Sequence, residues 1–228
     1  MNPLIRWQPS PNHQERLAGI PLDMLVLHYT GMRDQDLALA RLCDSEAAVS
    51  AHYLIDEQGD ITQLVAEERR AWHAGQSCWR GHRDVNSRSI GIELVNPGHQ
   101  FGYRPFPAVQ MQALAELATT LLARWPIPAQ NVVGHSDVAP LRKQDPGELF
   151  DWRWLADQGI GLWPRQGCVA GDGDAAPLLR HYGYDLVDAG DEPAVVAAFQ
   201  RHFRPSCCDG RLDPETLDRL HGLIDQLR

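Results

Sequence analysis

The chain has 228 residues, 43% of them hydrophobic and 22% charged, which is ordinary for a globular protein with one well-buried domain and room for a small second one. Its formal net charge of −9 argues against nucleic acid or an anionic membrane surface as the main partner. Five cysteines without a Cys-x-x-Cys pair predict neither a disulfide framework nor a thiolate zinc cluster.

The sequence predicts neither a membrane span nor a classical signal peptide. Its apolar runs all fall short of the roughly 20 residues that cross a bilayer. Residues 2–21 are polar and rich in proline, unlike a basic start followed by an apolar stretch. The expected location is therefore cytoplasmic, and the alternative is the periplasm, or export by an unrecognised route.

Apolar strands alternate with helical patterns along the first part of the chain. Residues 24–29 read as a buried strand, and 36–42 as a short helix. Residues 52–55 and 61–64 predict a hairpin with Gly59 in its turn. Residues 90–95 form another apolar run, interrupted by Gly91 and Glu93. A carboxylate in such a run must be paired, protonated or bound to something.

The clearest helix is predicted over residues 107–125. Leu114, Leu117, Leu121 and Trp125 share one face, and Pro107 suits the first turn. Residues 132–133 then form a brief strand that leads to His135. Strands alternating with helices predict an α/β domain, a mixed central sheet flanked by helices.

Composition changes after residue 164. We expect an amino-terminal domain over 1–164 (core 22–163), a polar, glycine-rich linker over 165–176, and a small three-helix domain over 177–228. Asp213 is a predicted helix cap with Pro214 in the first turn. Four aromatic residues are expected in the small core of this domain rather than in a sugar platform: Tyr182, Tyr184, Phe199 and Phe203.

Two histidines and an aspartate are candidate metal ligands. His28 ends a predicted strand, while His135 and Asp145 lie in one short connection. Two imidazoles and a carboxylate can hold a zinc ion (Zn²⁺) tetrahedrally and leave the fourth position to water, as in hydrolytic sites. Taken singly, His28 would read as a core histidine, and His135 or Asp145 as turn residues.

A zinc hydrolase also needs a base for the attacking water and a cation for the oxyanion. Glu93 and Lys143 are the candidates for these two tasks. The alternatives are a structural carboxylate paired with an arginine and a solvated surface lysine. The remaining histidines are expected at the surface or in packing, apart from His52 and His73: His13, His82, His99, His181, His202 and His221.

Six short motifs occur in an order that resembles the type 2 N-acetylmuramoyl-L-alanine amidases. They are LHYT at 27–30, SAHYLI at 50–55, AWHAG at 71–75, SIGIE at 89–93, GHSD at 134–137 and KQDPG at 143–147. This AmpD-like group shares its fold with phage lysozyme-type amidases and peptidoglycan recognition proteins. The carboxyl-terminal motifs resemble a three-helix peptidoglycan-binding module: YGY at 182–184, AFQRHFRP at 198–205 and DGRLDPET at 209–216.

The resemblance implies hydrolysis of the amide between N-acetylmuramic acid and L-alanine, in peptidoglycan or muropeptide fragments. It implies His28, His135 and Asp145 as zinc ligands, with Glu93 as the base and Lys143 beside the oxyanion. Four further residues are expected to contact the substrate: Trp72, His73, His52 and Asn96. Among these, His52 could equally be a core histidine or a partner of a ligand.

Three alternatives stay open on sequence alone. A non-catalytic recognition protein would bind muropeptide without cutting it, although such proteins typically lack a complete ligand set. A cytosolic amidase restricted to anhydro-muropeptide recycling would have no need of a second domain, which favours a polymeric or broader substrate. A zinc peptidase that cuts within the stem peptide would use the same site chemistry.

Overall fold

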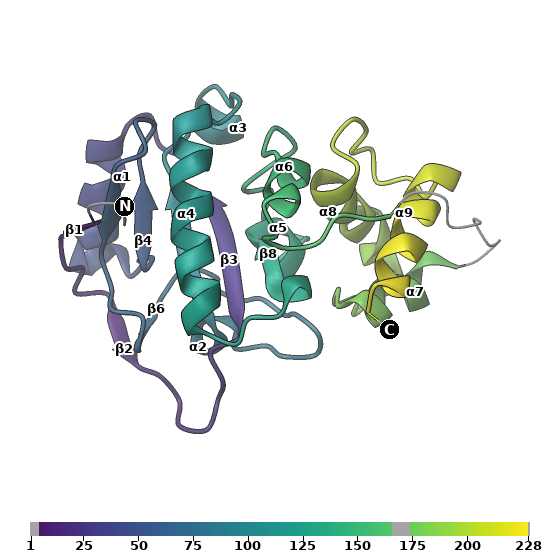
Figure 1. The fold of residues 1–228 in the computed structure, drawn as a ribbon. Helices are drawn as coiled ribbons and strands as arrows, with labels where there is room; N and C mark the ends of the chain where they lie inside the picture. The colour runs from purple at the N-terminus through teal and green to yellow at the C-terminus, as the bar shows by residue number, and fades with distance from the viewer. Residues whose placement is uncertain (1–4, 166–173, 228) are drawn as a thin grey trace.

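The computed structural model describes residues 5–165 and 174–227, and a six-stranded mixed sheet lies at its centre (Figure 1). Strand β4 is antiparallel to β5, and the other neighbours are parallel. In spatial order the strands are β1 (Ile5–Trp7), β5 (Ile61–Gln63), β4 (Tyr53–Ile55), β7 (Ser89–Leu94), β3 (Met24–Tyr29) and β8 (Val132–Gly134). Strands β2 (His13–Glu15) and β6 (Arg69–Ala71) form a separate antiparallel pair.

Side-chain alternation along β3 assigns each residue to one face of the sheet. Leu25 and Leu27 pack into a core that includes Leu114 and Leu117 of helix α4 (Ala108–Arg124), the helix that crosses the near face of the sheet in Figure 1. Met24 and Val26 belong to a different cluster, on the opposite face. Since His28 follows Val26 by two residues, it lies on that opposite face.

Side chains of the opposite face pack with helix α1 (Gln35–Cys43) and with the carboxyl-terminal helices, which lie beyond the β8 edge of the sheet in Figure 1. Helix α1 packs in a cluster with Leu54 and Leu64. Helices α7 (Ala175–Tyr182), α8 (Glu192–Phe203) and α9 (Pro214–Asp225) pack in the cluster that contains Met24 and Val26. His28 lies next to the last residue of β3. The other described helices are short: α2 (Val85–Arg88), α3 (Gly98–Phe101), α5 (His135–Val138), α6 (Trp152–Asp157) and the 3-10 turns Ser45–Ala47, Ala129–Asn131 and Ala189–Asp191.

The predicted α/β fold, a mixed sheet flanked by helices with helices added at the carboxyl end, is confirmed. Pro107 occupies the N-cap position of α4, one residue before its first turn, and makes no side-chain cap hydrogen bond. Asp213 caps α9 as predicted. Most of the predicted linker, residues 166–173, lies outside the described residues, and α7 begins at Ala175, within the predicted linker range. The division into two domains stays a prediction, because residues from both sides of it share one hydrophobic cluster.

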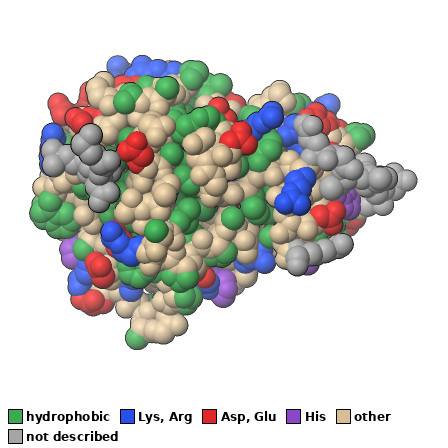
Figure 2. All heavy atoms as spheres, viewed as in Figure 1, with side chains coloured by type: hydrophobic (Ala, Val, Ile, Leu, Met, Phe, Trp, Pro, Cys, Tyr) green, Lys and Arg blue, Asp and Glu red, His purple; other side chains and the backbone are tan. Residues whose placement is uncertain are grey.

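Charged side chains of both signs are interspersed on the face of the molecule that Figure 2 shows, so the net charge is not gathered into one patch there. No helix within the described ranges, 5–165 and 174–227, has the length and apolar character needed to cross a membrane.

Candidate active site

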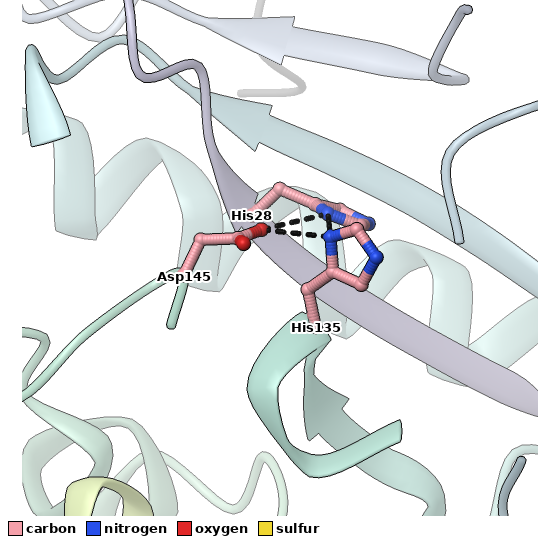
Figure 3. Close-up of side chains that lie close together, drawn as sticks. All are labelled: His28, His135 and Asp145. Carbon is pink, nitrogen blue, oxygen red and sulfur yellow. Dashed lines mark hydrogen bonds and ion pairs between the residues drawn. The ribbon is translucent and has the colours of Figure 1, made fainter. Parts of the chain in front are cut away.

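Three side chains from separate parts of the chain converge at one end of β3 (Figure 3). His28 comes from β3, His135 from the first residue of α5, and Asp145 from the loop beyond it. The Nδ1 atoms of His28 and His135 and the Oδ2 atom of Asp145 form a triangle with sides of 3.0 Å. All three side chains are buried.

The turns that carry His135 and Asp145 are joined through the backbone. The amide of Ser136 donates to the carbonyl of Asp145 at 2.9 Å. Gly134 permits this approach, because a Cβ at that position would lie 2.7 Å from Cδ of Pro146. The distance between the side chains of His135 and Asp145 is therefore set by the packing of their two turns and not by the side chains alone.

The outward-facing nitrogens of both histidines have hydrogen-bond partners. Nε2 of His135 lies 3.1 Å from the carbonyl oxygen of Ala74, to which it can only donate. Nε2 of His28 lies 3.0 Å from Nδ1 of His73, whose Nε2 lies 3.1 Å from the hydroxyl of Ser89. That hydroxyl donates to the carbonyl of Val85.

This chain of hydrogen bonds fixes the tautomers. Because the Ser89 hydroxyl donates onward, it accepts from Nε2 of His73, and Nδ1 of His73 then accepts from His28. Burial, followed by the charge of His135, lowers the pKa of His28 to about 4, and burial also lowers the pKa of His73, so both rings are neutral at pH 7. The Nδ1 lone pairs of His28 and His135 are thus left free to bind a cation.

Glu93 lies beside His28 on the same face of the sheet, because the two residues are partners in the parallel pairing of β3 with β7. Its Oε2 atom is buried and has no hydrogen-bond partner among the described residues. Burial and then the charge of Asp145 raise the pKa of Glu93 well above its usual value, against the opposing charge of Lys143. A carboxyl group with a raised pKa and a free oxygen is suited to accept and return a proton.

A cleft of about 440 Å³ opens over these residues, between α1 and the turn that carries His135. Glu93, His73, His135 and Asp145 line it, together with three cationic side chains: Arg41, Arg142 and Lys143. The cleft thus gathers positive charge in a chain whose net charge is negative. This favours a substrate that carries carboxylates.

The donor set fits a zinc ion. Two imidazole nitrogens and a carboxylate oxygen are typical of hydrolytic zinc sites, and ligands about 2.0–2.1 Å from a tetrahedral ion lie roughly 3.3–3.4 Å from one another. The triangle of 3.0 Å is slightly tighter than this. The burial of the carboxylate alone would raise the pKa of Asp145, but the neighbouring His135 and His28 hold it well below its usual value. Asp145 is therefore ionised, as a ligand must be.

Residues 18–148 of this chain match the sequence family of the N-acetylmuramoyl-L-alanine amidases. The chain belongs to this amidase family. AmiD of Escherichia coli is 40% identical, over 96% of this chain and 88% of its own length. The AmiD structure, a complex with the substrate anhydro-N-acetylmuramic acid-L-Ala-D-gamma-Glu-L-Lys, superposes with a TM-score of 0.82 and covers 93% of each chain.

Two further relatives differ in how much of the chain they match. AmpDH3 of Pseudomonas aeruginosa, solved in complex with anhydromuramic pentapeptide, has a TM-score of 0.82 and 35% identity, and covers 96% of this chain and 98% of its own. The 1,6-anhydro-N-acetylmuramyl-L-alanine amidase AmpD of Enterobacter cloacae is 36% identical over 64% of this chain and 86% of its own length. The amidase likeness therefore extends over nearly the whole chain in the first two relatives.

Of the four residues expected to contact substrate, the structure places one in the cleft and three outside its lining. His73 lines the cleft. His52 is fully buried, where its Nδ1 accepts from the amide of Gly91, and Asn96 is buried with its side chain bonded to Arg104 and Gly98. Trp72 is half-buried and donates to Gln14. None of these last three is among the residues that line the cleft, and their contact with substrate stays a prediction.

Sequence reasoning did not identify the groups that orient the amidase histidines. The side-chain oxygen of Asn86 accepts from the backbone amides of His73 and Ala74 at 3.1 and 2.9 Å, and so holds the segment that contacts both His28 and His135. Asn86 lies in the four-residue helix α2. Asp84 was a usable signal, because an aspartate ahead of such a turn is a common helix cap.

Proposed function

We propose that this chain is a zinc-dependent hydrolase of the amide between the lactyl group of N-acetylmuramic acid and the L-alanine of the stem peptide. The observation that carries the proposal is the triangle of His28, His135 and Asp145, with Glu93 beside it in the cleft. Family membership indicates which bond is cleaved, because the relatives are named as amidases of N-acetylmuramoyl-L-alanine or its 1,6-anhydro form.

His28, His135 and Asp145 would hold the zinc ion. When bound, zinc supplies Lewis acidity, which polarises the scissile carbonyl and lowers the pKa of water in the fourth position to roughly 7. Glu93 accepts the proton of the attacking water through its free oxygen and returns it to the departing alanine nitrogen. The Lys143 ammonium stabilises the oxyanion, a contribution typically worth about 10²–10³ in rate.

For the substrate, we propose muropeptides that carry a stem peptide, including those that end in the anhydro sugar. The complexes of AmiD and AmpDH3 contain such ligands, and the cations of the cleft would attract the carboxylates of the peptide. We also propose that the carboxyl-terminal helices help to engage polymeric peptidoglycan, which their sequence motifs suggest.

The test is mass spectrometry of products from intact sacculi and from purified anhydro-muropeptide, with and without a zinc chelator. Free stem peptides that disappear on chelation and return with added zinc would support the proposal. Release from the soluble fragment alone would limit the substrate to recycling fragments. Binding without release would contradict the enzymatic proposal, and fragments cut within the stem would indicate a peptidase.

A further inference from the structure

Asp137 is a buried carboxylate two residues after His135, and the proposed chemistry makes no use of it. Its side chain is 1% exposed. Oδ2 accepts from the backbone amide of Gly134 at 2.7 Å, so the side chain closes the turn that starts at His135. A carboxylate this deeply buried needs further donors, because an unpaired buried charge is costly.

Those further donors come from the carboxyl-terminal segment. Tyr184 follows Asp137 by 47 residues, and its hydroxyl donates to Oδ1 of Asp137 at 2.6 Å. His202, on α8, follows Asp137 by 65 residues, and its Nδ1 lies 2.7 Å from Oδ2 of Asp137. Both donors are themselves buried. The carboxylate that closes the His135 turn is thus held from outside the amidase segment, residues 18–148.

His202 makes a second connection to the same region. Its ring stacks on that of Trp152, with centroids 3.7 Å apart and planes 20° from parallel. Trp152 packs against Gly134, where a Cβ would lie 3.3 Å from the indole and 2.7 Å from Pro146. His202 therefore supports the turn that starts at His135 through Asp137 and, through Trp152, the packing beside the loop of Asp145.

We propose that Tyr184 and His202 are positioning residues for the metal centre, and that the carboxyl-terminal helices act through Asp137 to hold His135 in place. The inference rests on the proposed function, because it takes His135 as a zinc ligand. Metal ligands must be held within roughly 0.5 Å of their working geometry, and their supporting partners typically contribute 10–100-fold to metal affinity. The helices thereby have a task at the active site besides any contact with polymer.

The test compares full-length variants. His202→Ala and Tyr184→Phe each remove one donor to Asp137, while His202→Asn keeps an N–H near the position of Nδ1. Leu220→Val on α9 is the matched control, since Leu220 is buried in the same hydrophobic cluster but its side chain cannot donate a hydrogen bond. Zinc affinity is measured by competition with a chromogenic chelator, and ligand geometry by the visible spectrum of the Co²⁺-substituted protein.

We expect zinc affinity about tenfold weaker in His202→Ala, a smaller loss in Tyr184→Phe, and recovery in His202→Asn. The cobalt bands should change in His202→Ala, whereas Leu220→Val should lose thermal stability and keep both the affinity and the bands. Wild-type affinity and bands in both donor variants would overturn the inference and leave the amidase proposal standing. If His202→Ala does not fold, Tyr184→Phe decides. A wild-type protein that binds no zinc would overturn the proposed function itself.

Discussion

Glu93 is held at a cost in stability that its proposed catalytic role explains. It lies in a strand between apolar neighbours, and its buried Oε2 has no hydrogen-bond partner among the described residues. A residue selected for packing alone would not leave a carboxylate oxygen in this state, since desolvation without a partner is unfavourable. Unfavourable local chemistry in an otherwise well-packed strand is typical of active sites.

Glu93→Gln should separate activity from stability. The change preserves side-chain volume and removes a buried carboxyl group whose ionisation burial disfavours, so we expect an unchanged or higher melting temperature together with a loss of at least about 10²-fold in amide hydrolysis. Product release is followed by chromatography, and stability by thermal denaturation. Glu46→Gln, at an exposed position, is the control. A variant that retains its activity would remove Glu93 from the mechanism.

Gly91 makes room for the histidine that supports His28. A Cβ at Gly91 would lie 2.5 Å from Cγ of His73, inside any real contact distance. Gly91→Ala should therefore displace His73 from His28 and lower the free energy of unfolding by about 1–3 kcal/mol through overpacking. Urea denaturation and zinc affinity measure the two effects. Gly190→Ala is the control, because a Cβ there meets nothing within 4 Å, and equal behaviour of the two variants would contradict this account.

At the scale of elements, helix α2 is short but central to the site. Its cap, Asp84, accepts from the amide and hydroxyl of Ser87 and from Arg70. The helix presents Asn86 to the segment that carries His73 and Ala74. Four residues have little helical stability of their own. Side-chain hydrogen bonds at the cap must therefore keep this support in place.

The contribution of Asp84 should depend on pH. Burial alone raises the pKa of its carboxyl, but hydrogen bonds from Ser87 and Arg70 outweigh burial and hold the pKa below the ordinary 3.8. The stabilisation is then present above that ordinary value and is lost as pH falls through the lower folded pKa. Asp84→Ala should cost about 1 kcal/mol at pH 7, and its difference from wild type should shrink towards pH 3. Urea unfolding of both proteins between pH 7 and pH 3 is the measurement. A difference in unfolding free energy that stays constant with pH would contradict a contribution from the ionised Asp84 carboxylate.

At the scale of the whole molecule, the carboxyl-terminal helices share a hydrophobic cluster with residues of the sheet instead of forming a core apart from it. One hydrophobic cluster contains Val26 and Val133 of the sheet together with Phe199 of α8 and Leu220 of α9. The hydrogen bonds of Asp137 to Tyr184 and His202 cross the same boundary. A segment of about fifty residues is near the lower limit for an independent core, so shared burial is the more stable arrangement.

This shared core predicts cooperative unfolding. We expect one thermal transition with equal calorimetric and van't Hoff enthalpies, because neither part keeps its buried surface when the other unfolds. Differential scanning calorimetry of the full chain is the measurement. The variant Leu220→Val should shift that single transition as a whole. Two resolved transitions would show instead that the predicted domains unfold separately.

The sequence by itself determined the strands that carry the site and the residues that line up as its ligands. The apolar run at residues 24–29 predicts a buried strand with His28 near its end, and the motif order brings Glu93, His135 and Asp145 into the same family pattern. Such features depend on local period and spacing, which a chain displays before it folds. Strands β1, β2 and β6 escaped prediction because their residues are mostly polar and partly exposed, whereas the equally short β4, β5 and β8 stand out as apolar runs.

Only the tertiary structure decided which groups support the ligands. The carbonyl of Ala74, the ring of His73 and the carboxylate of Asp137 meet their partners through contacts between residues far apart in the chain. His202 is buried and hydrogen-bonded to Asp137, and nothing in its neighbouring residues separated it from surface histidines. Strand order and helix packing determine these long-range contacts, and local periodicity in the sequence encodes neither of them.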